Sequence, residues 1–110
     1  MPASETRNLT EPRPTTSDET IEQLLERPGV RIERIVGIGQ SSPPDFWYDQ
    51  ADDEWVLLVA GGARLQIEGE TTRTLSPGDH LFLPAHCRHR IEWTDPVTAT
   101  VWLAIHLRAT

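Results

Sequence analysis

The chain has 110 residues, enough for one domain with a single core. Its formal net charge is −7, and all ten of its basic residues are arginines, so it lacks the basic face that nucleic acid requires. A hydrophobic fraction of 37% is typical of a folded protein, and no apolar run is long enough to span a bilayer.

The single cysteine and the polar N-terminus bear on the compartment. Cys87 excludes an intrachain disulfide and fits a reducing environment. Residues 1–13 lack the apolar core of a secretion signal. We therefore expect a cytoplasmic protein with no nucleic-acid or membrane partner.

The first fifteen residues are predicted to be a disordered tail. They contain three prolines, several serines and threonines, and almost no large apolar side chains. Such a segment cannot bury enough surface to order itself. We therefore place a single domain over residues 16–110.

A short helix is predicted at the start of this domain. Thr16 and Glu19 have the spacing of a capping box, in which each side chain bonds to the other's backbone. A helix that begins there would carry Ile21, Leu24 and Leu25 on one face and end before a proline-glycine pair. We expect this helix to cover an open edge or end of the fold.

Short strands separated by turn signals fill the rest of the chain. In the first strand, Val30, Ile32, Val36 and Ile38 lie on one side, and Arg34 is the one charged residue on that apolar side. There is no internal repeat and no alternation of strands with helices, which favours an all-β sandwich or barrel. The predicted strands are residues 30–38, 46–50, 54–60, 63–67, 71–75, 80–83, 88–93 and 99–107.

Two stretches contain the residues with the most specific spacing. A glycine-aspartate pair at 78–79 is followed by Pro84, six residues after the glycine, and by His89, five residues further on. Upstream, Glu54 begins an apolar strand, and Gly61 follows seven residues later. These stretches resemble the two motifs of the cupin superfamily, small barrels whose lumen usually holds a metal. The resemblance implies a jelly-roll barrel, or double-stranded β-helix, of the single-domain cupin-2 type, here preceded by the short helix.

The first motif is degenerate at its metal-binding positions. In the family, three histidines and a glutamate hold Fe, Mn, Zn, Ni or Cu, and two of those histidine positions fall on Tyr48 and Gln50. Glu54 and His89 match the other two positions. A neutral amide and a protonated phenol are weak ligands for transition metals, so this set alone would lose much affinity.

Neighbouring residues could complete the metal site. His86 lies three residues before His89, and Asp49 could replace Gln50 if a bulge shifts the register by one residue. The resemblance thus implies a divalent transition metal (Fe, Mn, Zn or Ni) held by Glu54, His89, His86 and Gln50. A metal-free lumen stays open as the alternative.

Several side chains are predicted to line the lumen around this set. Aromatic rings beside His89 would give the lumen flat apolar walls that suit a small organic molecule. His106 alternates along the last strand with Trp102 and is predicted to face the mouth of the pocket. The residues expected to contact a ligand are Tyr48, Gln50, Trp93 and His106.

Several functions are open. The first is a metal-dependent enzyme acting on a small organic molecule, with Glu54 as ligand or general base and the reaction unassigned. The second is a non-catalytic barrel that binds or senses a metabolite without metal. A third is a sugar-phosphate isomerase of the phosphomannose isomerase type, although no inward-facing basic residue is evident. A barrel with a filled interior would act mainly through dimerisation, and cupins commonly pair, so we expect a homodimer.

Overall fold

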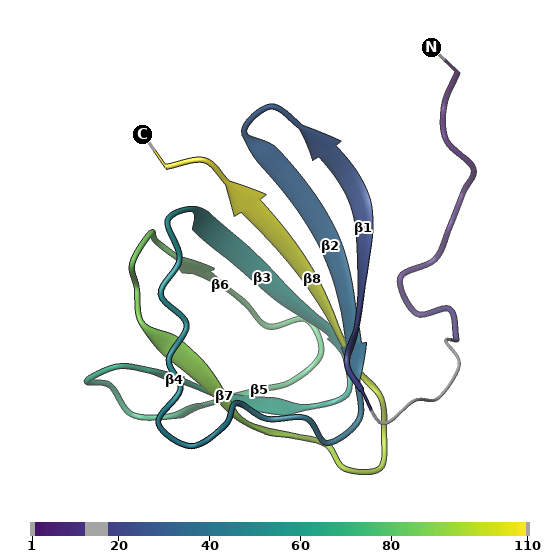
Figure 1. The fold of residues 1–110 in the computed structure, drawn as a ribbon. Coiled ribbons are helices and arrows are strands. Elements are labelled where there is room, and N and C mark those ends of the chain that lie inside the picture. Colours follow the sequence, from purple (N-terminus) through teal and green to yellow (C-terminus); the bar gives the residue numbers. More distant parts are fainter. Residues whose placement is uncertain (1, 13–17, 110) are drawn as a thin grey trace.

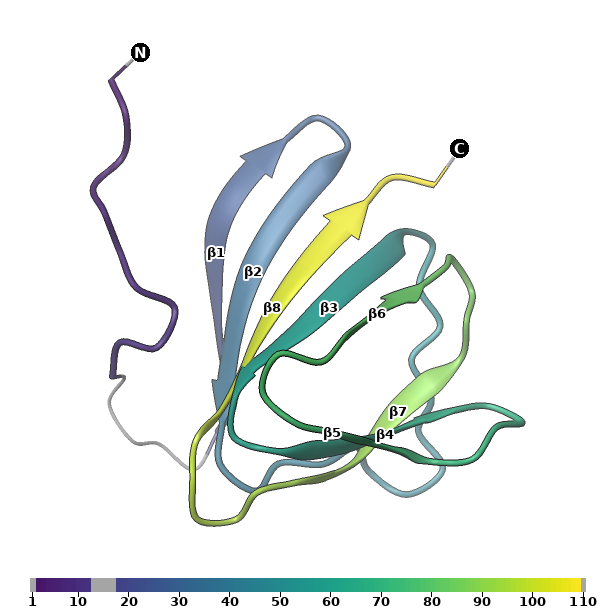
Figure 2. The same cartoon turned by 180° about the vertical axis from the view of Figure 1, so that it is seen from behind.

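The computed structural model describes residues 2–12 and 18–109, which contain eight strands (Figure 1). The strands form two antiparallel sheets, one in the order β1-β2-β8-β3-β6 and one in the order β5-β4-β7. Figure 2 shows the two sheets converging at one side of the molecule. The strands are β1 (Thr20–Arg27), β2 (Val30–Gly37), β3 (Asp53–Ala60), β4 (Ala63–Ile67), β5 (Arg73–Leu75), β6 (His80–Leu83), β7 (His89–Thr94) and β8 (Thr100–Leu107).

The apolar core lies between the two sheets. Leu58 of β3 and Leu65 of β4 are almost completely buried, and Trp102 of β8 packs in the same cluster. Each fully buried leucine contributes about 1.5–3 kcal/mol relative to an exposed one. Cys87 packs against this cluster, and burial raises the pKa of its thiol, so the thiol stays protonated. This packing leaves the opposite end of the space between the sheets open for polar residues.

The predicted N-terminal helix is wrong, because its residues form strand β1. β1 pairs with β2 from Thr20 to Arg27, with a bulge between Gln23 and Leu25. The bulge shifts the alternation by one residue. Ile21 and Leu25 therefore lie on opposite faces of a strand, although their four-residue spacing is typical of a helix. Thr16, the proposed capping residue, lies outside the described residues.

The other strands follow their predicted positions closely, with one exception. Residues 46–50 form no strand in the described structure, and only Tyr48 makes an isolated bridge, to His89. The described part of the chain contains no helix, so none of it could cross a membrane as one. The fold is the all-β barrel that was predicted, without its helix.

Arg34 is buried on the outer face of β2, where its side chain is only 2% exposed. Its Nη1 atom donates hydrogen bonds to the carbonyl oxygens of Leu9 (2.9 Å) and Glu11 (3.1 Å). Its Nη2 atom lies 3.5 Å from a carboxylate oxygen of Glu22 on β1. The N-terminal segment, which runs beside β1 in Figure 1, therefore supplies acceptors for a cation on the apolar side of β2. Disorder of residues 1–15 stays a prediction, and residues 1 and 13–15 lie outside the described ranges.

Candidate functional site

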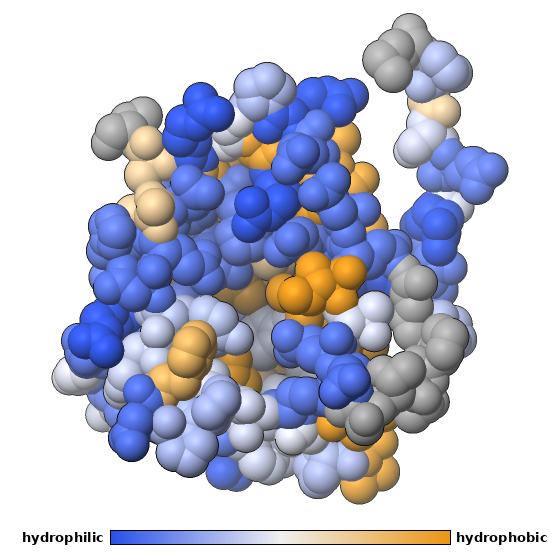
Figure 3. Space-filling model, viewed as in Figure 1, coloured by the Kyte–Doolittle hydropathy of each residue, from blue (hydrophilic) through white to orange (hydrophobic). Residues whose placement is uncertain are grey.

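A cavity of about 450 Å³ lies between the two sheets. The space-filling view shows a hollow on this face, with apolar residues in and beside it and a mostly hydrophilic surface around it (Figure 3). Its polar residues come mainly from β2, β3, β7 and β8 and from the segment before β3. The apolar part of its wall includes Ile35, Val56, Leu65, Leu83, Trp102 and Ala104.

Strands β3 and β8 place an acid and a base opposite each other. Glu54 pairs directly with His106 in the antiparallel register. Their side chains are on the same face as Val56 and Ala104, which line the cavity one step deeper. An oxygen of the Glu54 carboxylate lies 3.9 Å from Nε2 of His106.

The opposite sheet contributes His89, whose ring is held from two sides. Its Nδ1 atom lies 2.9 Å from the carbonyl oxygen of Cys87. A carbonyl can only accept, so Nδ1 carries the hydrogen. Tyr48 exchanges two backbone hydrogen bonds with His89, and the two rings stack with their centroids 5.3 Å apart. This arrangement directs Nε2 of His89 toward the other oxygen of Glu54, at 3.8 Å.

A second carboxylate, from β2, completes the polar wall. Nε2 of His106 lies 3.1 Å from an oxygen of Glu33, and the other Glu33 oxygen lies 3.3 Å from Nε of Arg31. An ionised carboxylate only accepts, so Nε2 of His106 carries a hydrogen and donates it to Glu33. Sequence reasoning missed Glu33 and Arg31 because it followed the apolar side of β2. Arg31 and Glu33 alternate with the apolar residues of β2, so their spacing could have indicated that they share the opposite face of this strand.

The spacing around Glu54 suits a bound oxygen atom. Both imidazole-to-carboxylate distances, 3.8 and 3.9 Å, are too long for direct hydrogen bonds. A ligand hydroxyl placed between Glu54 and an imidazole that carries a hydrogen on Nε2 could donate to the carboxylate and accept from the ring. The two imidazoles and the carboxylate can also hold or accept a proton, which is the requirement for acid–base chemistry. Glu54, His89 and His106 are only 9%, 6% and 7% exposed, so water screens them little.

Tyr48 adds a hydrogen-bond donor at the edge of this group. Burial raises the pKa of Tyr48 above its ordinary value, and the charges of Glu19 and Glu54 raise it further. Partial burial likewise raises the pKa of Glu19, which lines the same cavity. The phenol therefore keeps its proton at neutral pH, where it can donate a hydrogen bond to a ligand but is a poor metal ligand.

The residues present do not fit the metal that the resemblance implies. His86 is exposed, and its Nδ1 atom lies 2.7 Å from a carboxylate oxygen of Asp49. Neither of these two residues lines the lumen, whereas Gln50 does. Of the four predicted ligands, the lumen therefore holds one imidazole (His89), one carboxylate (Glu54) and one neutral amide (Gln50), which is a weak ligand. No group of three or more histidine, cysteine, aspartate or glutamate side chains among the described residues is arranged to hold a metal ion.

The predicted ligand-contacting residues separate into two groups. Tyr48, Gln50 and His106 line the lumen together with Glu54 and His89, as the sequence indicates. Trp93 does not line it. Its ring lies under the guanidinium of Arg64, 4.8 Å from the ring centroid. The tryptophan that lines the lumen is Trp102, from β8.

The fold and site define a small antiparallel barrel with a polar lumen. The family model described as the cupin domain matches residues 34–106, and the chain belongs to this family. No curated protein matches the sequence.

Solved structures agree with this assignment. A provisionally named mannose-6-phosphate isomerase from Ralstonia eutropha JMP134 is 50% identical over 96% of this chain and 100% of its own, with a TM-score of 0.92. A cupin superfamily protein from Desulfitobacterium hafniense is 22% identical over 96% of this chain and 100% of its own (TM-score 0.73). A cupin family protein with a double-stranded β-helix fold from Methanocaldococcus jannaschii is 16% identical over 89% of this chain and 87% of its own (TM-score 0.69). The last two similarities show the fold alone.

Proposed function

We propose that the protein binds a small hydroxylated organic molecule in the barrel lumen and that Glu54 exchanges a proton with it. The observation that carries this proposal is the position of the Glu54 carboxylate between the Nε2 atoms of His89 and His106. Apolar walls below these groups, including Trp102, would cover the carbon skeleton of the ligand. His89 and His106 would hold the oxygen atoms next to the carbon at which the proton moves.

The test is a screen of small sugars, sugar phosphates and hydroxy acids, followed by ¹H–¹⁵N NMR. The indole N–H of Trp102 reports on the lumen because this side chain is buried in the cavity wall. We expect at least one compound class to shift this signal in a saturable way. Compounds that shift only signals of the outer sheet face, with the Trp102 indole unmoved across the whole screen, would contradict the proposal.

Isomerisation of a sugar phosphate is a second candidate, favoured by one observation. Arg31 lines the lumen and supplies the inward-facing basic residue that the sequence did not reveal. A carboxylate such as Glu54 can take a proton from one carbon and return it to the next, while a second proton passes from the neighbouring hydroxyl to the carbonyl oxygen, so no oxidant is needed. The related Ralstonia protein provisionally carries an isomerase name, and we extend that activity to this chain only as a proposal.

We also propose that the protein forms a homodimer through the outer face of the larger sheet. One row of directly paired residues crosses all five strands on this face and is entirely apolar. Phe82, at the end of the row, is 53% exposed in the single chain. A second copy of the same face would cover the row by sheet-on-sheet packing about a two-fold axis. The row is Leu25, Ile32, Ile105, Trp55 and Phe82.

The dimer is tested by light scattering after gel filtration. We expect a mass of twice the chain mass of 12.4 kDa, and we expect Phe82→Glu to shift it toward a single chain. Phe46→Glu is the matched control, because Phe46 is also exposed but lies outside the sheets. A single-chain mass for the unmodified protein at micromolar concentration would refute this interface.

A further inference from the structure

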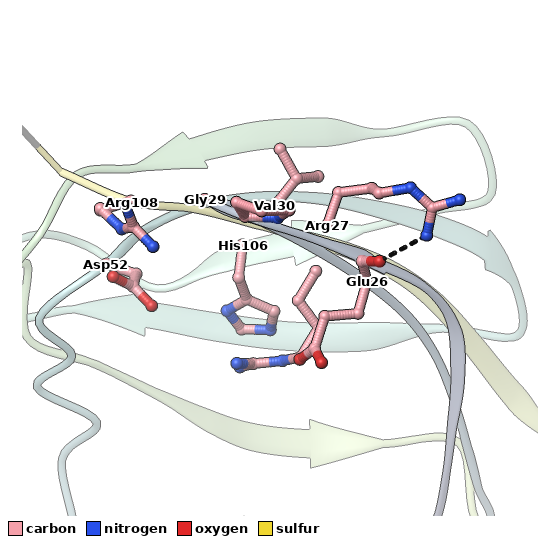
Figure 4. A pocket seen from close by; sticks show the side chains of 9 residues that line it. Glu26, Arg27, Gly29, Val30, Asp52, His106 and Arg108 are labelled. Carbon is pink, nitrogen blue, oxygen red and sulfur yellow. Dashed lines mark hydrogen bonds between the residues drawn. The ribbon is translucent and has the colours of Figure 1, made fainter.

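A second cavity, of about 440 Å³, opens at the mouth of the lumen. It lies where the turn between β1 and β2 meets the end of β8 (Figure 4). Arg31, Asp52 and His106 line both this cavity and the lumen. The two cavities are therefore adjacent and share these three side chains.

Positive charge is concentrated here in an otherwise acidic protein. Three of the ten arginines of the chain line this cavity, against two carboxylates, those of Glu26 and Asp52, so the local balance is +1 before His106 is counted. The whole chain has a net charge of −7. The three arginines are Arg27, Arg31 and Arg108.

Arg108 is held at its backbone while its side chain has no charged partner. Its backbone N–H donates to the carbonyl oxygen of Gly29 at 2.9 Å, which fixes the end of β8 against the turn. No ion pair within 4 Å joins its guanidinium to another described residue. Figure 4 shows Arg108 and Asp52 on the same side of the cavity, with the His106 ring beside them.

The other two arginines differ in their availability. Arg27 donates from Nη1 to the carbonyl of Glu26, and in Figure 4 its side chain extends away from His106. Arg31 lies 3.3 Å from Glu33 through Nε, which is buried and makes no hydrogen bond of good geometry. No hydrogen bond or ion pair joins the Nη atoms of Arg31 to another residue that the structure describes. Arg31 and Arg108 are therefore the two guanidinium groups open to a ligand.

We propose that Arg31 and Arg108 form an anion subsite at the barrel mouth, which takes the carboxylate or phosphate group of a small molecule whose remainder enters the lumen. Guanidinium groups bind both anions through paired hydrogen bonds, in which two N–H groups meet two oxygens. Glu26 and Asp52 lower the net charge at the cavity, so free phosphate binds only weakly. The extension into the lumen rests on the proposed function, whereas anion binding by the two arginines does not.

The test is an NMR titration with inorganic phosphate and, separately, with acetate, at an ionic strength held constant with sodium chloride. We expect saturable shifts of the backbone amides of Gly29, Asp52 and Arg108. Arg108→Gln should lower the affinity for the anion that binds more tightly by about tenfold. This is the loss expected for one charge-assisted contact. The anion that binds more tightly identifies the head group.

The matched control is Arg73→Gln, which makes the same charge change on the exposed hairpin, where Arg73 pairs with Glu70. This variant should bind phosphate and acetate as the unmodified protein does. The subsite is overturned if Arg108→Gln binds the anions as tightly as the unmodified protein. It is also overturned if Arg108→Gln and Arg73→Gln lose the same amount of anion affinity. The Trp102 indole separates the two proposals. If a lumen ligand shifts the Trp102 indole signal but neither anion binds at the mouth, only the subsite is overturned. If an anion binds at the mouth but no compound binds in the lumen, only the proposed function is refuted.

Discussion

Replacing Glu54 with glutamine is expected to weaken lumen binding about 10- to 100-fold while leaving the fold intact. Glutamine has nearly the same shape, so packing in the wall of the cavity is kept. The change removes the charge between His89 and His106, together with any charge-assisted hydrogen bond to a ligand hydroxyl. Such bonds contribute about 1.5–3 kcal/mol each, which corresponds to this range of affinity.

The measurement is a titration of the compounds that shift the Trp102 indole in the unmodified protein. His86→Ala is the informative control, because His86 is exposed and contacts Asp49 outside the lumen. We expect its affinity to be unchanged. If Glu54→Gln binds these compounds as tightly as the unmodified protein, Glu54 does not contact the ligand.

The second large effect concerns Gly61, at the turn between β3 and β4. Gly61→Ala should lower the free energy of unfolding by about 2–5 kcal/mol, from backbone strain and overpacking together. Its φ of +85° lies in the left-handed region, and a Cβ atom there would come within 2.6 Å of the Ala99 carbonyl oxygen and of Thr100. The backbone of the loop before β8 would have to move.

Chemical denaturation gives the free energy of unfolding of Gly61→Ala and of Gly69→Ala. Comparing the two variants separates backbone strain from overpacking. Gly69 has a similar φ of +82°, but a Cβ atom there would meet nothing within 4 Å. The control should therefore lose only the conformational part, about 1–2 kcal/mol. Equal losses in the two variants would mean that the close approach at Gly61 relaxes without cost.

The fold was predictable because its turns depend on local chemistry. Gly61 and Gly78 both have positive φ and stand where the sequence predicts turns. His86, two residues after Pro84, has a φ of 63° and adopts the same left-handed conformation without being a glycine. Strand β1 was not predictable in this way, since its bulge produces the apolar spacing of a helix.

The candidate site was predictable only in part. Glu54, His89 and His106 were found by motif spacing and by alternation along a strand, and all three line the lumen. Glu33 and Arg31 were missed because the lumen side of β2 is its polar side. A rule that follows apolar residues leads instead to the outer face of the larger sheet.

The most direct test of the account is the metal content of the untagged protein, purified without added metal or chelator. Among the described residues, no three histidine, cysteine, aspartate or glutamate side chains are arranged to hold a metal ion. The account predicts far less than one transition metal per chain, and ligand shifts of the Trp102 indole that do not change after treatment with chelator. About one metal per chain, lost in Glu54→Gln together with ligand binding, would contradict it.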